Sequence, residues 1–197
     1  MRALLRVRPA GRCRVMLPMV VSAAEVRTVR TLLDQLRREL AVAEPIQVGA
    51  MIETPAAAIT ADQIAEVTDF LSIGTNDLTQ YTLAMDRGHP ELAGQLDALH
   101  PAVLRLIAAA ARAGVARGRM VAVCGSLAAD PLAVPILIGL GVTELSVVPA
   151  AVPQMKALIA TLTIEACRDV ARAALEAPDA EAVRASVTPL LPEREIA

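Results

Sequence analysis

The sequence has almost no aromatic side chains, with one Phe, one Tyr and no Trp among its 197 residues. Hydrophobic residues nevertheless make up 55% of the chain. The core must therefore be built from Ala, Val, Leu, Ile and Met, and a chain of this length can bury a sizeable one. No interior linker or internal repeat divides the sequence, so we expect a single domain over residues 1–197.

Other features are scarce as well. The net charge of −2 offers no basic footprint for nucleic acid. The three cysteines, Cys13, Cys124 and Cys167, form no CxxC pair, which argues against a disulfide framework or zinc site and favours a reducing cytosol. No uncharged run reaches the roughly 18 residues of a membrane span, and Pro18 interrupts the short apolar run near the start, unlike a secretory signal. We predict a cytoplasmic protein with no nucleic-acid partner and no membrane insertion.

Short apolar runs of strand type alternate with segments of helical periodicity. This alternation predicts an α/β fold with a parallel sheet covered by helices. The predicted strands are residues 14–21, 46–52, 70–73, 120–124 and 144–148. The predicted helices are residues 23–43, 55–67, a short one from 77, 101–117, 130–139, and two or three segments from 152 broken near Pro178.

The longest stretch predicted to be irregular, residues 86–101, holds both histidines. His89 and His100 each precede a proline, a position typical of a turn, and Pro101 suits the first turn of a helix. We therefore assign both histidines a turn role and no chemical one.

The most informative motif is DFLSIGTNDLTQYTLAMDR at residues 69–87. A strand stops at Gly74, and the polar turn Thr75-Asn76-Asp77 leads into a helix. Unpaired N–H groups and the helix dipole at such a place favour an anion. A divalent cation held by Asp77 can bind the same anion from the other side.

Polar residues follow several predicted strands at their carboxyl ends, where parallel sheets place their chemistry. Glu53 and Asp77 end consecutive strands, so their carboxylates should lie close together and need a cation or proton between them. Mg²⁺ takes one or two carboxylates plus waters and substrate oxygens. From the residues alone, capping of the helices that follow is an equal alternative. The polar strand-end residues are Glu53, Asn76, Asp77, Cys124, Ser126 and Ser146.

Two further candidate residues would be given structural roles if each were considered alone. Arg87 has the position of a solvated arginine at a helix end, and Cys124 that of a small buried hydrophobe at a strand end. We assign Cys13 and Cys167 structural roles.

The segment Ser72–Tyr81, together with Glu53-Thr54-Pro55-Ala56, resembles the signature of the phosphoenolpyruvate-utilising enzymes. The resemblance runs from about Arg2 to the end of the chain and is strongest to the C-terminal domain of Enzyme I of the bacterial sugar phosphotransferase system. It implies a TIM (β/α)₈ barrel, which needs eight units and about 250 residues. This chain would supply the last five units, strands 4–8, without the first three units and the N-terminal phosphohistidine domain.

The resemblance also implies a reaction: Mg²⁺-dependent phosphoryl transfer from phosphoenolpyruvate to a protein histidine, with release of pyruvate, feeding sugar uptake. It makes Glu53 and Asp77 the Mg²⁺ ligands and assigns substrate binding to Asn76, Asp77 and Arg87. Cys124 becomes the general acid that protonates the enolpyruvate, which a thiol can do. The implied partners are a phosphocarrier protein, through the missing N-terminal region, and a second copy in a homodimer.

One departure from the Enzyme I pattern follows Cys124, where Gly125-Ser126-Leu127 stands in place of Gly-Glu-Leu. The chain by itself holds about half a site, so we expect it not to complete the transfer alone. Three alternatives remain open: a domain like that of pyruvate phosphate dikinase or phosphoenolpyruvate synthase, a non-enzymatic binding or dimerisation module, and a fragment without independent function.

Overall fold

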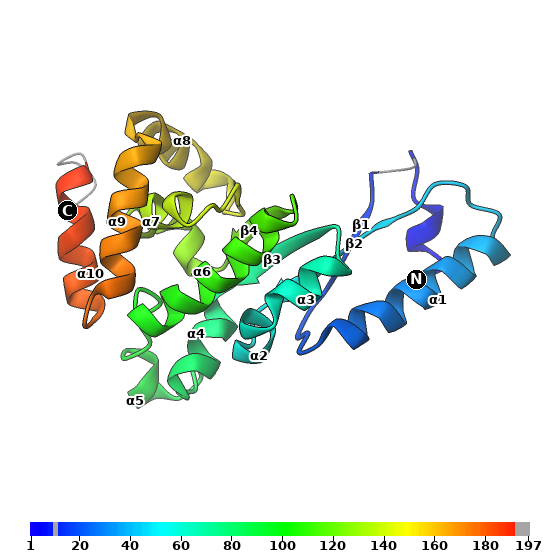
Figure 1. Cartoon of the computed structure of the whole chain (residues 1–197), viewed down its shortest axis with the longest axis horizontal. Helices are drawn as coiled ribbons and strands as arrows, with labels where there is room; N and C mark the ends of the chain where they lie inside the picture. Colours follow the sequence, from blue (N-terminus) through cyan, green and yellow to red (C-terminus); the bar gives the residue numbers. More distant parts are fainter. Residues whose placement is uncertain (10–11, 192–197) are drawn as a thin grey trace.

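The computed structural model describes residues 1–9 and 12–191, in which strands and helices alternate as predicted (Figure 1). The strands are β1 (Arg14–Leu17), β2 (Gln47–Ile52), β3 (Phe70–Gly74), β4 (Met120–Cys124) and β5 (Glu144–Leu145). The helices are α1 (Ala23–Glu39), α2 (Pro55–Ile59), α3 (Ala61–Glu66), α4 (Thr75–Leu83), α5 (Pro90–Ala93), α6 (Pro101–Ala116), α7 (Ala133–Gly139), α8 (Val152–Thr161), α9 (Ile164–Glu176) and α10 (Ala180–Val187). Short 3₁₀ helices lie at Leu4–Arg6, Ser126–Ala129, Pro149–Ala151 and Thr188–Leu190.

The strands form one sheet in the order β1-β2-β3-β4-β5, and every neighbouring pair is parallel. The register places Ile52 beside Ile73 and Gly74 beside Cys124. All strands therefore end at the same edge, which confirms the predicted parallel sheet and the shared location of the strand-end residues. Among the described strands, β1 and β5 are the two edges, so the sheet is open.

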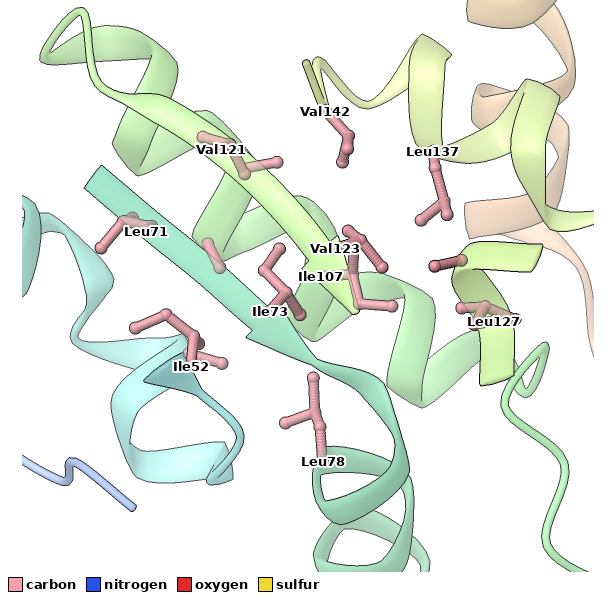
Figure 2. Packing of buried hydrophobic residues seen from close by; sticks show 14 of the residues in the cluster. Ile52, Leu71, Ile73, Leu78, Ile107, Val121, Val123, Leu127, Leu137 and Val142 are labelled. Atoms are coloured by element: carbon pink, nitrogen blue, oxygen red, sulfur yellow. The ribbon is translucent and has the colours of Figure 1, made fainter. Parts of the chain in front are cut away.

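One face of the sheet is sealed by helices, and its core contains no aromatic side chain among the described residues. Leu71, Ile73, Val121 and Val123 point into this face and are fully buried. They pack with Ile107 of α6 and with side chains of neighbouring elements (Figure 2). The predicted aliphatic core is thus confirmed, and it fixes the strands whose ends carry the polar residues.

Several predicted boundaries were wrong, each for a local reason. The first strand ends at Leu17 instead of residue 21, because Pro18 lacks an N–H and Met19 adopts a left-handed backbone with φ of 53°. The helix predicted over residues 55–67 is split into α2 and α3 at Thr60, whose hydroxyl donates to the carbonyl of Ala56 at 2.8 Å.

Other elements are longer or shorter than predicted. Helix α4 begins at Thr75, two residues before the predicted start, and α7 begins three residues late, at Ala133. The last strand has only two residues of the five predicted, and a 3₁₀ helix beginning at Pro149 follows soon after it. The stretch over residues 86–101 contains the one-turn helix α5.

The turn role of the two histidines is confirmed. His89 and His100 are the N-caps of α5 and α6, and their Nδ1 atoms accept from the backbone N–H groups of Glu91 and Ala102 at 3.3 and 3.1 Å. Within the described ranges, none of the helices combines the length and apolar character needed to cross a membrane.

The C-terminal helices dock through Gly139 at the end of α7. Figure 1 shows α9 beside α7, with α9 and α10 at the end of the molecule opposite α1. A Cβ at Gly139 would collide with the carbonyl oxygen of Cys167 and lie 2.8 Å from the Cβ of Ala171. The absence of a side chain at this position therefore sets how closely α9 approaches.

We expect Gly139→Ala to lower the free energy of unfolding by about 2 kcal/mol, because the added methyl group forces α9 away from α7. Denaturant unfolding measures the change. Gly94→Ala is the control, since that glycine also lies at the C-terminal end of a helix and has φ of −73°, and a Cβ there would meet no atom within 4 Å. Equal stability of the two variants would contradict this account of the contact.

Candidate functional site

Glu53 follows β2 and is held at the carboxyl edge of the sheet. The residue is 4% exposed, and its Oε1 accepts from the backbone N–H of Met19 at 2.6 Å. It lies across the end of β3, since a Cβ at Gly74 would be only 2.8 Å from Oε2. Gly74 thus makes the space in which the Glu53 carboxylate sits.

Neither strand-end carboxylate acts as the cap of the helix that follows it. Thr54 is the N-cap of α2, and its hydroxyl oxygen accepts from the N–H of Ala57 at 3.1 Å. Gly74 is the N-cap of α4, and Asp77 lies inside the first turn. The capping alternative for Glu53 and Asp77 is therefore wrong, because other residues occupy the N-cap positions of both helices.

Asp77 and Arg87 form an ion pair, with 3.1 Å between Oδ1 and Nη2. The chain returns toward Asp77 because Ala84, the residue after α4, has a left-handed conformation, and because Gln80 Oε1 accepts from the N–H of Arg87 at 3.2 Å. The two side chains are 28% and 52% exposed. An ion pair this exposed stabilises a fold very little, so its members are available to ligands.

Asn76 contacts the turn after β4. Its Oδ1 accepts from the backbone N–H of Ser126 at 3.0 Å and from the Ser126 hydroxyl at 2.9 Å. Next to it, the Thr75 hydroxyl donates to the carbonyl of Cys124 at 2.8 Å. The turns that follow β3 and β4 are thus tied together.

The Cys124 thiol lies at the end of β4 and is partly exposed, in contrast to the buried Cys167, whose pKa is raised by its burial. Cys124 Sγ lies 3.5 Å from the carbonyl oxygen of Ile73 and 3.8 Å from the hydroxyl of Ser72. Its exposure differs from that of the small buried hydrophobe expected of a strand-end cysteine. The thiol can exchange a proton with a molecule bound on the open face.

Three of the candidate residues, Cys124, Asn76 and Arg87, line two hollows of similar size, whereas Glu53 and Asp77 line neither of these two. One, of about 280 Å³, lies on the open face of the sheet and is lined by Cys124 and Ser72 together with Arg14 and Phe70. The other, of about 290 Å³, is lined by Asn76, Arg87 and Ser126 together with residues of the loop before α6. The turn from Cys124 to Ser126 contributes to both, so it lies between them.

The donor set at this edge suits a hard cation. Within the described residues no three His, Cys, Asp or Glu side chains gather into a metal cluster. Glu53 and Asp77 supply carboxylate oxygens alone, and Mg²⁺ is bound by one or two carboxylates, with waters and substrate oxygens completing its coordination. The residues present therefore fit Mg²⁺ and do not fit zinc, which requires more nitrogen or sulfur ligands.

A second ion pair supports the hollow that Asn76 and Arg87 line. Nη1 and Nη2 of Arg184 donate to Asp97 at 2.6 and 3.0 Å, and Asp97 also accepts from the N–H of Leu99. Burial raises the pKa of Asp97, but the Arg184 and backbone hydrogen bonds outweigh it and the pKa is lowered. The ion pair between Arg184 and Asp97 connects α10 to the loop whose Leu96 and Ala98 line the hollow.

Three of these contacts were not predicted from the sequence: Met19 with Glu53, Ser126 with Asn76, and Arg184 with Asp97. Near these contacts, the sequence gives a local signal only for the hydrogen bond from the N–H of Leu99 to Asp97, since an Asp often accepts from the N–H two residues further on. The residues of the three unpredicted contacts lie 34, 50 and 87 positions apart in the sequence, so no local pattern links them.

Comparison with known proteins places the chain in a family. Residues 1–164 match the family described as PEP-utilising enzyme, PEP-binding domain. The multiphosphoryl transfer protein of Rhodobacter capsulatus is 47% identical over 184 residues, which cover 93% of this chain and 22% of that protein. The phosphoenolpyruvate-protein phosphotransferase of Haemophilus influenzae is 38% identical over 201 residues, covering 100% of this chain and 35% of that protein. The chain therefore spans only between 22% and 35% of the length of these relatives.

Solved structures show the same fold at low sequence identity. A citrate lyase from Burkholderia xenovorans superposes with a TM-score of 0.62 at 21% identity, covering 96% of this chain and 66% of that one. The CitE protein of Mycobacterium tuberculosis, in complex with magnesium, acetoacetate and coenzyme A, gives 0.51 at 21% identity, covering 81% and 55%. These similarities concern the fold alone. With the family match extending over most of its length, the chain belongs to the PEP-utilising enzymes and corresponds to their PEP-binding domain.

Proposed function

We propose that the chain binds phosphoenolpyruvate with Mg²⁺ at the carboxyl edge of its sheet, as the catalytic PEP-binding part of a phosphoenolpyruvate–protein phosphotransferase. The observation that carries the proposal is the pair formed by Asp77 and Arg87 beside Asn76, within the matched domain. This pair joins a carboxylate suited to Mg²⁺ with a guanidinium suited to a phosphoryl group.

In this proposal Glu53 and Asp77 hold the metal. When bound, Mg²⁺ offsets the negative charge on the carboxylate and phosphoryl oxygens of the substrate. Arg87 exchanges its contact with Asp77 for the phosphoryl group, which a planar guanidinium can hold by two hydrogen bonds. Asn76 donates to the same group from its Nδ2.

Cys124 is the proton donor in this proposal. The phosphoryl group passes to a histidine nitrogen outside this chain, since His89 and His100 serve as helix caps. The enolate that remains takes a proton at its methylene carbon from the Cys124 thiol, giving pyruvate and a thiolate. In the reverse direction the thiolate removes a proton from the methyl group of pyruvate.

The wider assignments belong to the same proposal. The five strand–helix units would form strands 4–8 of a (β/α)₈ barrel, whose active sites lie at the carboxyl ends of the strands. The phosphoryl group would continue to a phosphocarrier protein for sugar uptake in the cytoplasm, and the parent protein would be a homodimer. The coverage of 22–35% of the relatives supports the view that the rest of this machinery lies outside the chain.

Calorimetric titration with phosphoenolpyruvate, with and without Mg²⁺, tests the proposal. We expect saturable binding that requires Mg²⁺, because two carboxylates near the site repel the trianionic ligand until a cation is bound. Pyruvate, which lacks the phosphoryl group, is the control and should bind much more weakly. A folded sample that releases no binding heat with either ligand would contradict the proposal and favour a role as a dimerisation module.

A further inference from the structure

Ser126 contacts the proposed phosphate-binding residue from a neighbouring turn. Its backbone N–H and its hydroxyl both donate to Oδ1 of Asn76, at 3.0 and 2.9 Å. We propose that Ser126 is a positioning residue, which fixes the Asn76 carboxamide so that both Nδ2 hydrogens face the phosphoryl group. The proposal rests on the proposed function of this site and adds a residue to it.

The chemistry of the two donors dictates which way the carboxamide is turned. A backbone N–H can only donate, so the atom that it meets must be the carboxamide oxygen. A flipped side chain would place the Nδ2 hydrogens against the N–H of Ser126 and lose both hydrogen bonds. With Oδ1 occupied by Ser126, the carboxamide offers a ligand only donors, which suits an anion.

The backbone around Ser126 holds this contact in place. Gly125 has φ of 92°, a conformation that favours glycine, and a Cβ there would lie 2.5 Å from Thr75 Oγ1 and 2.9 Å from Asn76 Oδ1. The Thr75 hydroxyl bonds the carbonyl of Cys124 in the same turn. Ser126 therefore fixes Asn76 relative to the turn that carries the thiol, and so relative to the proposed proton donor.

The residue type matters at this position. Ser126 stands where the resemblance to Enzyme I predicts a glutamate, and an ionised carboxylate has no hydrogen to donate to Asn76 Oδ1. Ser126 lines the same hollow as Asn76 and Arg87. A neutral donor there orients Asn76 without placing a negative charge beside the bound phosphoryl group.

The test is a double-mutant cycle on the full chain, with calorimetric titration of phosphoenolpyruvate in the presence of Mg²⁺. Ser126→Ala keeps the backbone donor and removes the hydroxyl, so we expect Kd to rise about fivefold, the effect of one hydrogen bond. Ser126→Thr retains a hydroxyl, and its Kd should stay within about twofold of the wild-type value. In an Asn76→Ala background, Ser126→Ala should cause no further loss, because Ser126 acts through Asn76.

A ligand-free measurement checks the orientation itself. In ¹⁵N NMR spectra, the Nδ2 signals assigned by their loss in Asn76→Ala should shift in Ser126→Ala and remain in place in Ser126→Thr. Unchanged signals, or an unchanged Kd in Ser126→Ala, would overturn the proposal. An equal loss of affinity in both backgrounds would also overturn it, since Ser126 would then contact the ligand directly. If wild type binds no phosphoenolpyruvate, the proposed function fails first and this inference fails with it, although the NMR result still reports whether Ser126 orients Asn76.

Discussion

Asp77→Ala should abolish the Mg²⁺-dependent binding of phosphoenolpyruvate, raising Kd about a hundredfold or more. The substitution removes one of the two carboxylates proposed to hold the metal, and it leaves Glu53 as the remaining anionic ligand. Loss of one member of a charged, ligand-binding pair costs about 2–5 kcal/mol, and each 1.4 kcal/mol is a tenfold change in affinity. Calorimetric titration with and without Mg²⁺ measures the effect.

The structure supplies a matched control for this variant. Asp62 is also an acidic residue in the first turn of a helix, and its side chain is exposed on α3. Asp62→Ala therefore makes the same change in charge and should leave both Kd and its dependence on Mg²⁺ unaltered. Asp77→Asn keeps the size of the side chain, so a loss equal to that of Asp77→Ala would assign the effect to the charge. Mg²⁺-dependent binding that survives in Asp77→Ala would remove Asp77 from the metal site.

The parallel sheet and the location of its polar residues could be predicted because their signals are local. Apolar runs such as residues 70–73 mark a buried strand, and in a parallel sheet all strands end at one edge. The polar turn at Thr75-Asn76-Asp77 comes directly after such a run, so its place at that edge followed from the sequence. The resemblance to the family then predicted roles for these residues, which the geometry alone does not assign.

The contacts that hold these residues could not be predicted, because they join segments that are distant in the sequence. Nothing near Glu53 in the sequence indicates that the N–H of Met19 would donate to it, since the two residues are brought together by the pairing of β1 with β2. Likewise, Ser126 meets Asn76 only because the register places Gly74 beside Cys124. The ends of β1 and α2 were predicted wrongly for the opposite reason. Pro18 and Thr60 act locally, but the hydrophobic pattern of the sequence continues past them and hides their effect.

Arg87→Gln should change the affinities for the two ligands in opposite directions. The affinity for phosphoenolpyruvate should fall about a hundredfold, because a neutral side chain replaces the guanidinium that holds the phosphoryl group. The affinity for Mg²⁺ in the absence of phosphoenolpyruvate should rise a few-fold, because the Arg87 guanidinium lies 3.1 Å from Asp77 and repels the cation. Separate calorimetric titrations with Mg²⁺ alone, and with phosphoenolpyruvate at saturating Mg²⁺, measure the two effects.

The opposite signs separate a ligand-binding role of Arg87 from a structural one. If the pair with Asp77 served only the fold, Arg87→Gln would weaken both affinities together and lower the melting temperature. An exposed pair contributes at most about 1 kcal/mol to stability, so we expect the melting temperature to change little. Arg117→Gln is the matched control, because it breaks a pair with Glu66 of similar length, 3.2 Å, that is also exposed and belongs to neither hollow. If Arg87→Gln left the affinities for both ligands unchanged, the pair with Asp77 would not be part of the binding site. If both affinities fell, the pair would only support the turn after α4.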